Sequence, residues 1–92
     1  MIQIFKISGD SLYPFYKNGQ RVVCRKVWSK TPIKVNDIVV FEKENYGHMI
    51  KIVKSIENFN YFVEGTNPFS IDSRNFGELK HDDIKYKVLF KF

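Results

Sequence analysis

Polar turns divide the chain into short segments that are rich in valine, isoleucine and aromatic residues. Within the segments, apolar residues either alternate with polar ones or form short runs, as they do in strands buried on one face or on both. No stretch keeps apolar residues at helical spacing over several turns. The segments that we expect to form strands are 2–7, 21–28, 37–43, 48–56, 61–64 and 84–92.

The connections contain the residues that turns favour. Asn18-Gly19 and Glu44-Asn45-Tyr46-Gly47 each predict a tight turn, and residues 65–77 form a long loop rich in glycine, asparagine, serine and aspartate. A single helical turn is expected over residues 10–16. With no long helix, the pattern predicts a mostly β fold: a twisted, partly closed antiparallel or mixed sheet with at most one short helical turn.

The composition is that of one folded domain. A length of 92 residues leaves room for a single domain, residues 1–92. Hydrophobic residues make up 43% and charged residues 27%, which argues against a disordered chain. Aromatic residues reach 16% and alanine is absent, and both facts favour strands over helices.

The charge and the cysteine count exclude several classes of protein. The net charge is +5, but lysine and arginine are scattered, as on a solvated surface, so we expect no nucleic-acid partner. Cys24 is the only cysteine, which rules out an internal disulfide and a multi-cysteine zinc site. No apolar run approaches the roughly 18 residues of a membrane helix, so we expect a soluble, cytoplasmic protein without a transmembrane segment.

Ser11 is a candidate nucleophile. It follows the first expected strand directly, in the segment Gly9-Asp10-Ser11-Leu12-Tyr13-Pro14. A nucleophile needs an exposed hydroxyl on a rigid elbow, with backbone N–H groups free to bind an oxyanion. Gly9 would let a substrate approach the backbone closely. The ordinary alternative is a serine that caps a loop, and on this segment alone the alternative is favoured.

Lys51 is a candidate general base. It shares one face of its strand with Met49 and Val53, so its amine is expected among apolar neighbours. Such surroundings lower the pKa of a lysine, and a neutral amine can take a proton from a serine hydroxyl. The alternative is a lysine whose stem packs while its ammonium group reaches water, as we expect for Lys54.

The loop reading EGTNPFSIDSRNFG, residues 64–77, is long for a small domain, and such loops are usually functional. Asp72 and Arg74 are spaced to form an ion pair that stiffens the loop. Ser70 can donate or accept a hydrogen bond near a site. The alternative is a surface loop made of turn-forming residues.

Other chemistries are less well supported. His48 and His81 have no nearby cluster of carboxylates and cysteines, so we expect no metal and no cofactor. Both histidines are expected to be solvated, which disfavours a Ser-His-Asp triad although the residue types would allow one. No phosphate-binding glycine loop is present, and no pair of carboxylates stands out.

Together these segments resemble a known family, the type I signal peptidases and their LexA-type relatives. SGDSLYPFYKNGQRVV resembles their nucleophile box, usually Ser-Gly-x-Ser-Met-x-Pro followed by a Gly-Asp turn and a valine-rich strand. MIKIVKSI resembles their lysine box, and the 40 residues from Ser11 to Lys51 are typical of shorter members. EGTNPFSIDSRNFG resembles the late box, usually Gly-Asp-Asn-x-x-Ser-x-Asp-Ser-Arg-x-x-Gly, which LexA-type repressors lack.

The resemblance implies a serine endopeptidase with a Ser/Lys dyad. Ser11 would attack the scissile carbonyl, with its own N–H helping to bind the oxyanion, and Lys51 would be the neutral general base. Ser70 matches the serine that orients the lysine amine. Asp72 and Arg74 match an ion pair that supports the site. The resemblance also implies that four residues around Ser11 support the oxyanion site and substrate binding, namely Gly9, Asp10, Leu12 and Pro14.

The sequence departs from the family pattern at several positions. Ile52 stands where arginine is usual, Thr66 where the late box has aspartate, and Leu12 where methionine is usual. Gln20 and Asn36 replace aspartates of Gly-Asp turns. These changes leave the proposed dyad intact, but the finer structure of the site and its full activity stay open.

Only ten residues precede Ser11, so we expect no N-terminal membrane anchor. This short form, and the pair Asn67-Pro68, resemble the small proteases that mature nickel superoxide dismutase. We therefore expect a protein or peptide substrate, with a signal peptide or short N-terminal extension, bound as an extended strand beside the sheet. Phe90 and Phe92 beside Lys91 leave peripheral membrane association open. The sequence does not indicate an oligomeric state.

Three alternatives are kept beside this interpretation. A non-catalytic peptide-binding or regulatory domain would share the fold without cleaving anything. A nucleic-acid partner would use the basic surface, and salt-dependent retention on a heparin column would reveal it. A self-cleaving LexA-type protein is disfavoured, since no helix-turn-helix segment precedes the candidate site.

Overall fold

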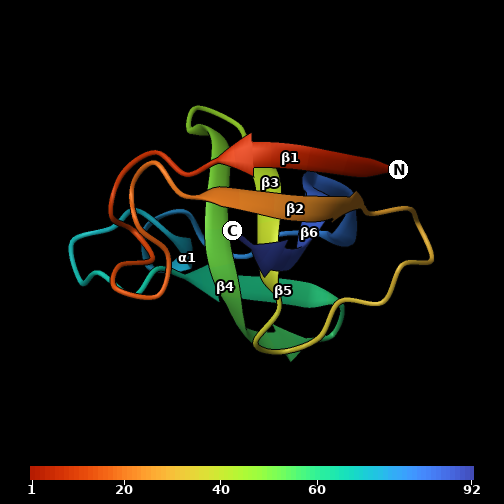
Figure 1. The fold of residues 1–92 in the computed structure, drawn as a ribbon. Coiled ribbons are helices and arrows are strands. Elements are labelled where there is room, and N and C mark those ends of the chain that lie inside the picture. Colours follow the sequence, from red (N-terminus) through yellow and green to blue (C-terminus); the bar gives the residue numbers. More distant parts are fainter.

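Six strands form one antiparallel sheet in the computed structural model, which describes all 92 residues (Figure 1). The strands are β1 (Ile2–Lys6), β2 (Arg21–Lys26), β3 (Ile38–Lys43), β4 (Gly47–Glu57), β5 (Asn60–Glu64) and β6 (Ile84–Lys91). Their order across the sheet is β1-β2-β6-β3-β4-β5, and every pairing is antiparallel. The sheet stays open, with β1 and β5 at its edges. The mostly β fold predicted from the hydrophobic pattern is confirmed.

The strands are strongly twisted relative to one another. In Figure 1, β1 and β2 cross the direction of β3 and β4, and β5 crosses it again on the other side. Register shifts occur between Val23 and Cys24, between Val40 and Phe41, and between Val53 and Ser55. Irregularities of this kind bend a strand and increase its local twist. The sheet therefore curls around its own apolar side chains without closing.

Residues 10–16, where a single helical turn was expected, contain one helix-type hydrogen bond but are not a regular helix. Residues 10–16 form successive turns, closed by bonds such as that from the Tyr16 N–H to the Leu12 carbonyl at 2.9 Å. The short helices are α1 (Ser73–Phe76), inside the loop expected over residues 65–77, and η1 (His81–Asp83). Each is too short to carry a periodic apolar pattern, so only its cap could have indicated it.

Two groups of buried side chains lie on opposite faces of β3. Val39 and Phe41 belong to the larger group and Val40 to the smaller, because successive side chains of a strand point to opposite faces. The larger group comprises Val27, Ile33, Val39, Phe41, Val53, Tyr61, Val63, Leu79 and Ile84. The smaller comprises Ile7, Val22, Cys24 and Val40. Burial on both faces makes β3 the rigid centre of the sheet.

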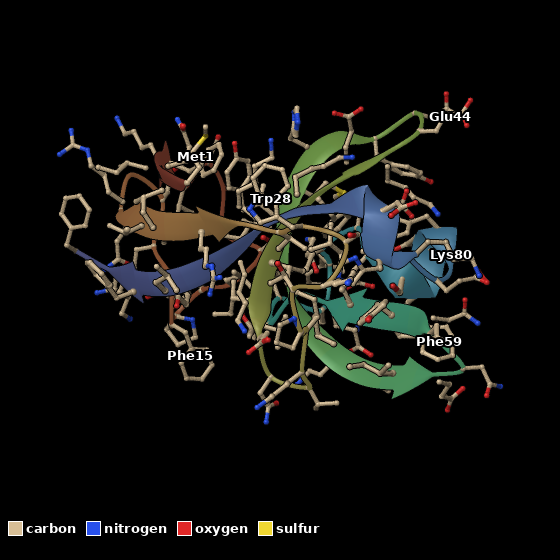
Figure 2. The ribbon with its side chains drawn as sticks, turned by 90° about the vertical axis from the view of Figure 1, so that its right-hand side faces the viewer. Met1, Phe15, Trp28, Glu44, Phe59 and Lys80 are labelled. Carbon is tan, nitrogen blue, oxygen red and sulfur yellow. The ribbon has the colours of Figure 1, made fainter.

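Several aromatic side chains remain outside both groups. Phe15 and Phe59 project from the molecule in Figure 2, with exposed fractions of 60% and 86%. Phe90 and Phe92, at the C-terminal end, are also exposed. Neither α1 nor η1 is long enough to cross a membrane.

Candidate active site

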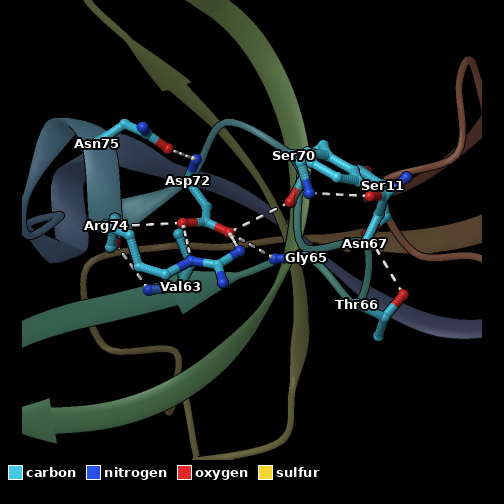
Figure 3. Close-up of polar contacts among 11 residues, drawn as sticks. Ser11, Val63, Gly65, Thr66, Asn67, Ser70, Asp72, Arg74 and Asn75 are labelled. Carbon is cyan, nitrogen blue, oxygen red and sulfur yellow. Dashed lines mark hydrogen bonds and ion pairs between the residues drawn. The ribbon is translucent and has the colours of Figure 1, made fainter.

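Two loops that are far apart in the sequence meet at Ser11 (Figure 3). Ser11 lies in the connection between β1 and β2, and its carbonyl oxygen accepts the N–H groups of Thr66 at 2.7 Å and Asn67 at 3.2 Å. The Thr66 hydroxyl donates to the Tyr13 carbonyl at 2.6 Å. The loop after β5 therefore holds the backbone at Ser11 and again at Tyr13, two residues later.

Gly65 allows these two loops to come this close. A Cβ atom at this position would lie 2.5 Å from the Ser11 carbonyl oxygen and 2.4 Å from Ser70 Oγ. Both distances are far shorter than a van der Waals contact, and the Ser11 oxygen belongs to the backbone and cannot rotate away. Glycine is thus required at this position for reasons of space. No role for Gly65 was expected from the sequence.

Lys51 is buried inside β4. Its exposed fraction is 2%, and it lies directly opposite Val39 on β3, on the same face as Met49 and Val53. The neighbours expected from strand alternation are therefore present. Burial lowers the pKa of Lys51, since the charged form loses hydration that apolar neighbours do not replace.

Asp72 and Arg74 act on the pKa of Lys51 in opposite directions. The Asp72 carboxylate raises it and the Arg74 guanidinium lowers it, while desolvation remains the largest influence. The two side chains form the ion pair expected from their spacing, with Arg74 Nη2 2.6 Å from Asp72 Oδ2 and Nε 2.9 Å from Oδ1. The fork of two hydrogen bonds neutralises most of the carboxylate's charge. The Asp72 carboxylate therefore stabilises the ammonium form of Lys51 less strongly than an unpaired carboxylate would.

The Asp72 carboxylate is itself fully buried and links several elements (Figure 3). It accepts the Gly65 N–H at 3.0 Å and the Ser70 hydroxyl at 3.3 Å, and it caps α1 by accepting the Arg74 N–H at 3.0 Å. Burial disfavours its charge, but the hydrogen bonds from Arg74 and Gly65 outweigh burial and bring the pKa of Asp72 to about 2. Asp72 is therefore ionised whenever the protein is folded near neutral pH.

Ser11 and Lys51 line the same cavity, whose volume is about 320 Å³. No direct hydrogen bond joins their side chains, and the Lys51 amine takes part in none of the ion pairs. Hydrogen bonds between catalytic groups are often long before substrate binds and shorten in the complex. The other residues that line the cavity are Phe5, Lys6, Ile7, Ser8, Val40, His48, Met49 and Ile50.

One wall of the cavity is an unpaired edge of β4. β5 pairs with β4 only from Ile52, which lies opposite Glu64, so the part of β4 before Ile52 has no strand on that side. The Val53 N–H donates to the Asp37 carbonyl on the β3 side. Because the direction of N–H and C=O groups alternates along a strand, those of His48 and Ile50 point to the open side.

The opposite wall is the free edge of β1. Arg21 exchanges two backbone hydrogen bonds with Phe92, so the backbone of Lys6, which lies opposite Arg21, is not bonded to β2. The polar groups of Lys6 therefore face away from the sheet. Two unpaired strand edges thus flank the cavity that holds Ser11 and Lys51.

The backbone N–H of Ser11 makes no hydrogen bond to the backbone of the chain. A tetrahedral intermediate on the Ser11 hydroxyl would place its oxygen next to this group, which is the position of an oxyanion donor. Gly9, two residues earlier, adopts a φ of 91°, in the region that favours glycine, and its N–H donates to Asn18 Oδ1 at 2.9 Å. The turn before Ser11 is therefore fixed from the other end of the same loop.

The remaining residues suggested by the sequence lie outside this cavity. Ser70 donates its hydroxyl to Asp72 and not to the Lys51 amine. Leu12 is 1% exposed and packs inside the molecule, so it does not form a wall of the cavity. Asp10 lines a second cavity, and Pro14 lines neither. Phe5, Ile7 and Ile50 also line the cavity and were not expected there, although their apolar character in two strands was a usable signal.

The two histidines have partners other than Ser11 and Lys51. His48 Nε2 pairs with Glu42 Oε2 at 3.1 Å on the surface, at the rim of the cavity. His81 is half-buried and not solvated as expected, because its Nε2 lies 2.8 Å from the Thr31 carbonyl oxygen and its ring packs edge-on against Tyr61. No group of three histidine, cysteine, aspartate or glutamate side chains could hold a metal ion.

No protein-family model matches the chain, and a search of curated proteins gives no significant match.

Proposed function

We propose that the protein is a serine endopeptidase in which Ser11 is the nucleophile and Lys51 is the general base. The observation that carries the proposal is the shared cavity. It is lined by the half-buried Ser11 and by the buried Lys51, whose pKa is lowered. A buried amine of lowered pKa and a nearby hydroxyl are the parts that an activated serine needs. The resemblance of three sequence segments to the type I signal peptidases supports the same assignment.

The chemistry would proceed through an acyl-enzyme. The neutral Lys51 amine takes the proton of the Ser11 hydroxyl as Oγ forms a bond to the scissile carbonyl carbon. The carbonyl oxygen becomes negatively charged and accepts the Ser11 N–H. The intermediate collapses by breaking the C–N bond, and the Lys51 ammonium returns its proton to the leaving amine. The Lys51 amine, neutral again, then deprotonates a water molecule, which attacks the acyl-enzyme, releases the acid and regenerates Ser11.

The substrate would bind as an extended strand between β1 and β4. The backbone groups of Lys6 on one side and of His48 and Ile50 on the other are unpaired and border the cavity. A peptide inserted between them would form hydrogen bonds to both edges, as in other cases of strand addition. The apolar side chains of Phe5, Ile7 and Ile50 would contact alternate residues of that peptide.

The test is hydrolysis of a mixture of short synthetic peptides, followed by mass spectrometry. Wild-type protein should cleave the mixture, and Ser11→Ala and Lys51→Met should each lower the rate at least about 10³-fold, the usual cost of removing a nucleophile or its base. Ser55→Ala and Lys54→Met on the same strand as Lys51 are matched controls and should retain activity. Wild-type rates in the Lys51→Met protein would refute the mechanism.

A non-catalytic peptide-binding domain is the second candidate, favoured by the absence of a direct Ser11–Lys51 hydrogen bond. The two unpaired strand edges would serve that function equally well. The same experiment separates the two, because a binding domain would leave every peptide intact. A serine-reactive phosphonate would then form no adduct at Ser11, whereas an active peptidase would be labelled there and the Ser11→Ala protein would not.

A further inference from the structure

The segment from Ser8 to Tyr13 separates two cavities. The first contains Lys51, and the second, also of about 320 Å³, is lined by Asp10, Tyr13, Thr66, Asn67 and Pro68. The two cavities have no residue in common. Because Ser11 lines the first and its neighbours Asp10 and Tyr13 line the second, a chain attached to Ser11 can enter both.

The two cavities differ in charge. The charged or titratable residues around the first are Lys6, His48 and Lys51, all of which are cationic when protonated. The second contains one charged residue, Asp10, whose carboxylate takes part in none of the ion pairs. A cavity lined by an unpaired carboxylate and by an aromatic residue, Tyr13, can attract cations. The charge of this cavity is therefore opposite in sign to the net charge of the protein, which is +5.

The walls of the second cavity are held in place. The Thr66 hydroxyl donates to the Tyr13 carbonyl at 2.6 Å, and the Asn67 N–H donates to the Ser11 carbonyl at 3.2 Å. Asn67 Oδ1 accepts the Phe69 N–H at 2.9 Å, which fixes its side chain. A cavity with such walls changes little when a ligand enters it.

The direction of the substrate follows from the strand edges. The acyl part must stay bound until water releases it, so it occupies the first cavity, which has two unpaired edges to hold it. The part that follows the scissile bond then lies toward the second cavity. The Cα atoms of Asp10 and Ser11 are about 3.8 Å apart, and an extended residue spans about 3.4 Å, so the carboxylate is within reach of the first two residues after the bond.

We propose that the second cavity is a binding site for a cationic side chain, lysine or arginine, in the first two residues after the scissile bond, with Asp10 as its counter-ion. This inference rests on the proposed peptidase function and adds a substrate class to it. The preference applies to the leaving side of the bond only, because Lys6 disfavours a cation on the acyl side and the first cavity contains no carboxylate to attract one.

The test compares cleavage positions in the peptide mixture for wild type, Asp10→Asn and Asp10→Lys. Wild type should cut before lysine or arginine about tenfold more often than before aspartate or glutamate, since the exposed Asp10 carboxylate attracts a cation and repels an anion. Asp10→Asn should remove the preference and Asp10→Lys should reverse it. Glu44→Gln, which removes an equal charge at the exposed β3–β4 turn (Figure 2), should leave it unchanged.

Two results would overturn the inference while leaving the peptidase function intact. One is cleavage by wild type with no charge preference after the bond, and the other is the same preference in wild type and Asp10→Lys. If wild type cleaves nothing, the peptidase function fails. The cation site is then tested by measuring peptide binding. A fluorescent peptide that begins with two lysines should then bind wild type about tenfold more tightly than one that begins with two glutamates. Equal binding, or equal discrimination by Asp10→Asn, would reject the cation site.

Discussion

The backbone of Gly65 touches the backbone of Ser11: a Cβ atom on Gly65 would lie 2.5 Å from the Ser11 carbonyl oxygen. This contact joins the end of β5 to the loop that carries the candidate nucleophile. The Gly65 N–H points the other way and donates to Asp72 Oδ2 at 3.0 Å. Gly65 therefore connects the Asp72–Arg74 ion pair to Ser11.

Gly65→Ala should reduce peptidase activity more than it reduces stability. The added methyl group must push the Ser11 backbone aside, and a displacement of about 1 Å at a reacting group can cost about 100-fold in rate. The cost in the free energy of unfolding should be about 1–3 kcal/mol, as for other overpacked sites. The measurements are the rate of peptide cleavage and urea denaturation.

Gly77→Ala is the matched control for that substitution. Gly77 has a φ of 84° at the end of α1, and no atom lies within 4 Å of its would-be Cβ. Alanine there should cost about 1 kcal/mol of stability through backbone strain, with no loss of activity. Equal activity losses in the two variants would show that the Gly65 contact has no special importance for Ser11.

Lys51→Met should make the protein more stable, by an amount that depends on pH. Burial lowers the pKa of Lys51, so the unfolded chain binds more protons than the folded one between the lowered value and about 10.5. Wild-type stability therefore rises with pH in that window, and the penalty is fully present below it. Methionine carries no charge, so its advantage should be about 1 kcal/mol or more at low pH and should shrink as pH rises.

Denaturant unfolding of both proteins over a series of pH values measures that advantage. Lys54→Met, at an exposed position of the same strand, should change the free energy of unfolding by no more than about 0.5 kcal/mol at any pH. A constant difference between wild type and Lys51→Met across the pH series would mean that Lys51 is not desolvated as the structure indicates.

Arg74→Gln should move the activity profile to higher pH. The Arg74 guanidinium lowers the pKa of Lys51 and neutralises the Asp72 carboxylate, which raises it. Without Arg74, the Lys51 ammonium is favoured, and the neutral base appears only at more alkaline pH. We expect the rising limb of kcat/KM against pH to shift to higher pH, with activity largely recovered on the alkaline plateau.

Arg74→Lys is the conservative variant for this experiment. It retains the positive charge beside Asp72 but loses the two parallel hydrogen bonds, so the profile should return most of the way toward wild type. Activity that falls equally at every pH, with no shift of the rising limb, would indicate that Arg74 only supports the loop.

Phe59→Gly should stabilise the protein. Phe59 and Asn58 form the β4–β5 turn with φ values of 66° and 49°, and the Phe59 side chain is 86% exposed. A bulky residue in the left-handed region is strained, while its ring gains little from packing, so glycine should add about 0.5–1 kcal/mol to the free energy of unfolding. Phe69→Gly, at an exposed residue without a positive φ, is the control and should not stabilise.

The pattern of alternating and contiguous apolar residues was sufficient to predict all six strands, although β1 has no buried residue. β3 is the clearest case: Val39, Val40 and Phe41 are contiguous in sequence and buried on both faces of the sheet. The same reasoning placed Lys51 between Met49 and Val53. Helix α1 escaped prediction because it is only four residues long, and because Asp72, which caps it through the Arg74 N–H, was interpreted only as half of an ion pair.

The site was harder to predict than the strands. Ser11 and Lys51 were selected by their local surroundings and by resemblance, but their common cavity depends on how far β5 extends along β4. Pairing lengths between strands are set by tertiary packing and leave no mark on either strand alone. For the same reason, the second cavity beside Asp10 could not have been foreseen, since its walls come from two loops that meet only in the folded chain.

The pairing of β5 with β4 begins at Ile52 and leaves only His48–Lys51 as a free template. An incoming polypeptide can therefore add no more than a few rungs to the ladder before it must turn away from the sheet. A longer polypeptide therefore gains no further backbone hydrogen bonds. A folded protein cannot insert the interior strands of its sheets into so narrow an opening. If the protein is the peptidase proposed above, such geometry would restrict cleavage to tails, linkers and loose ends and would leave well-folded proteins intact.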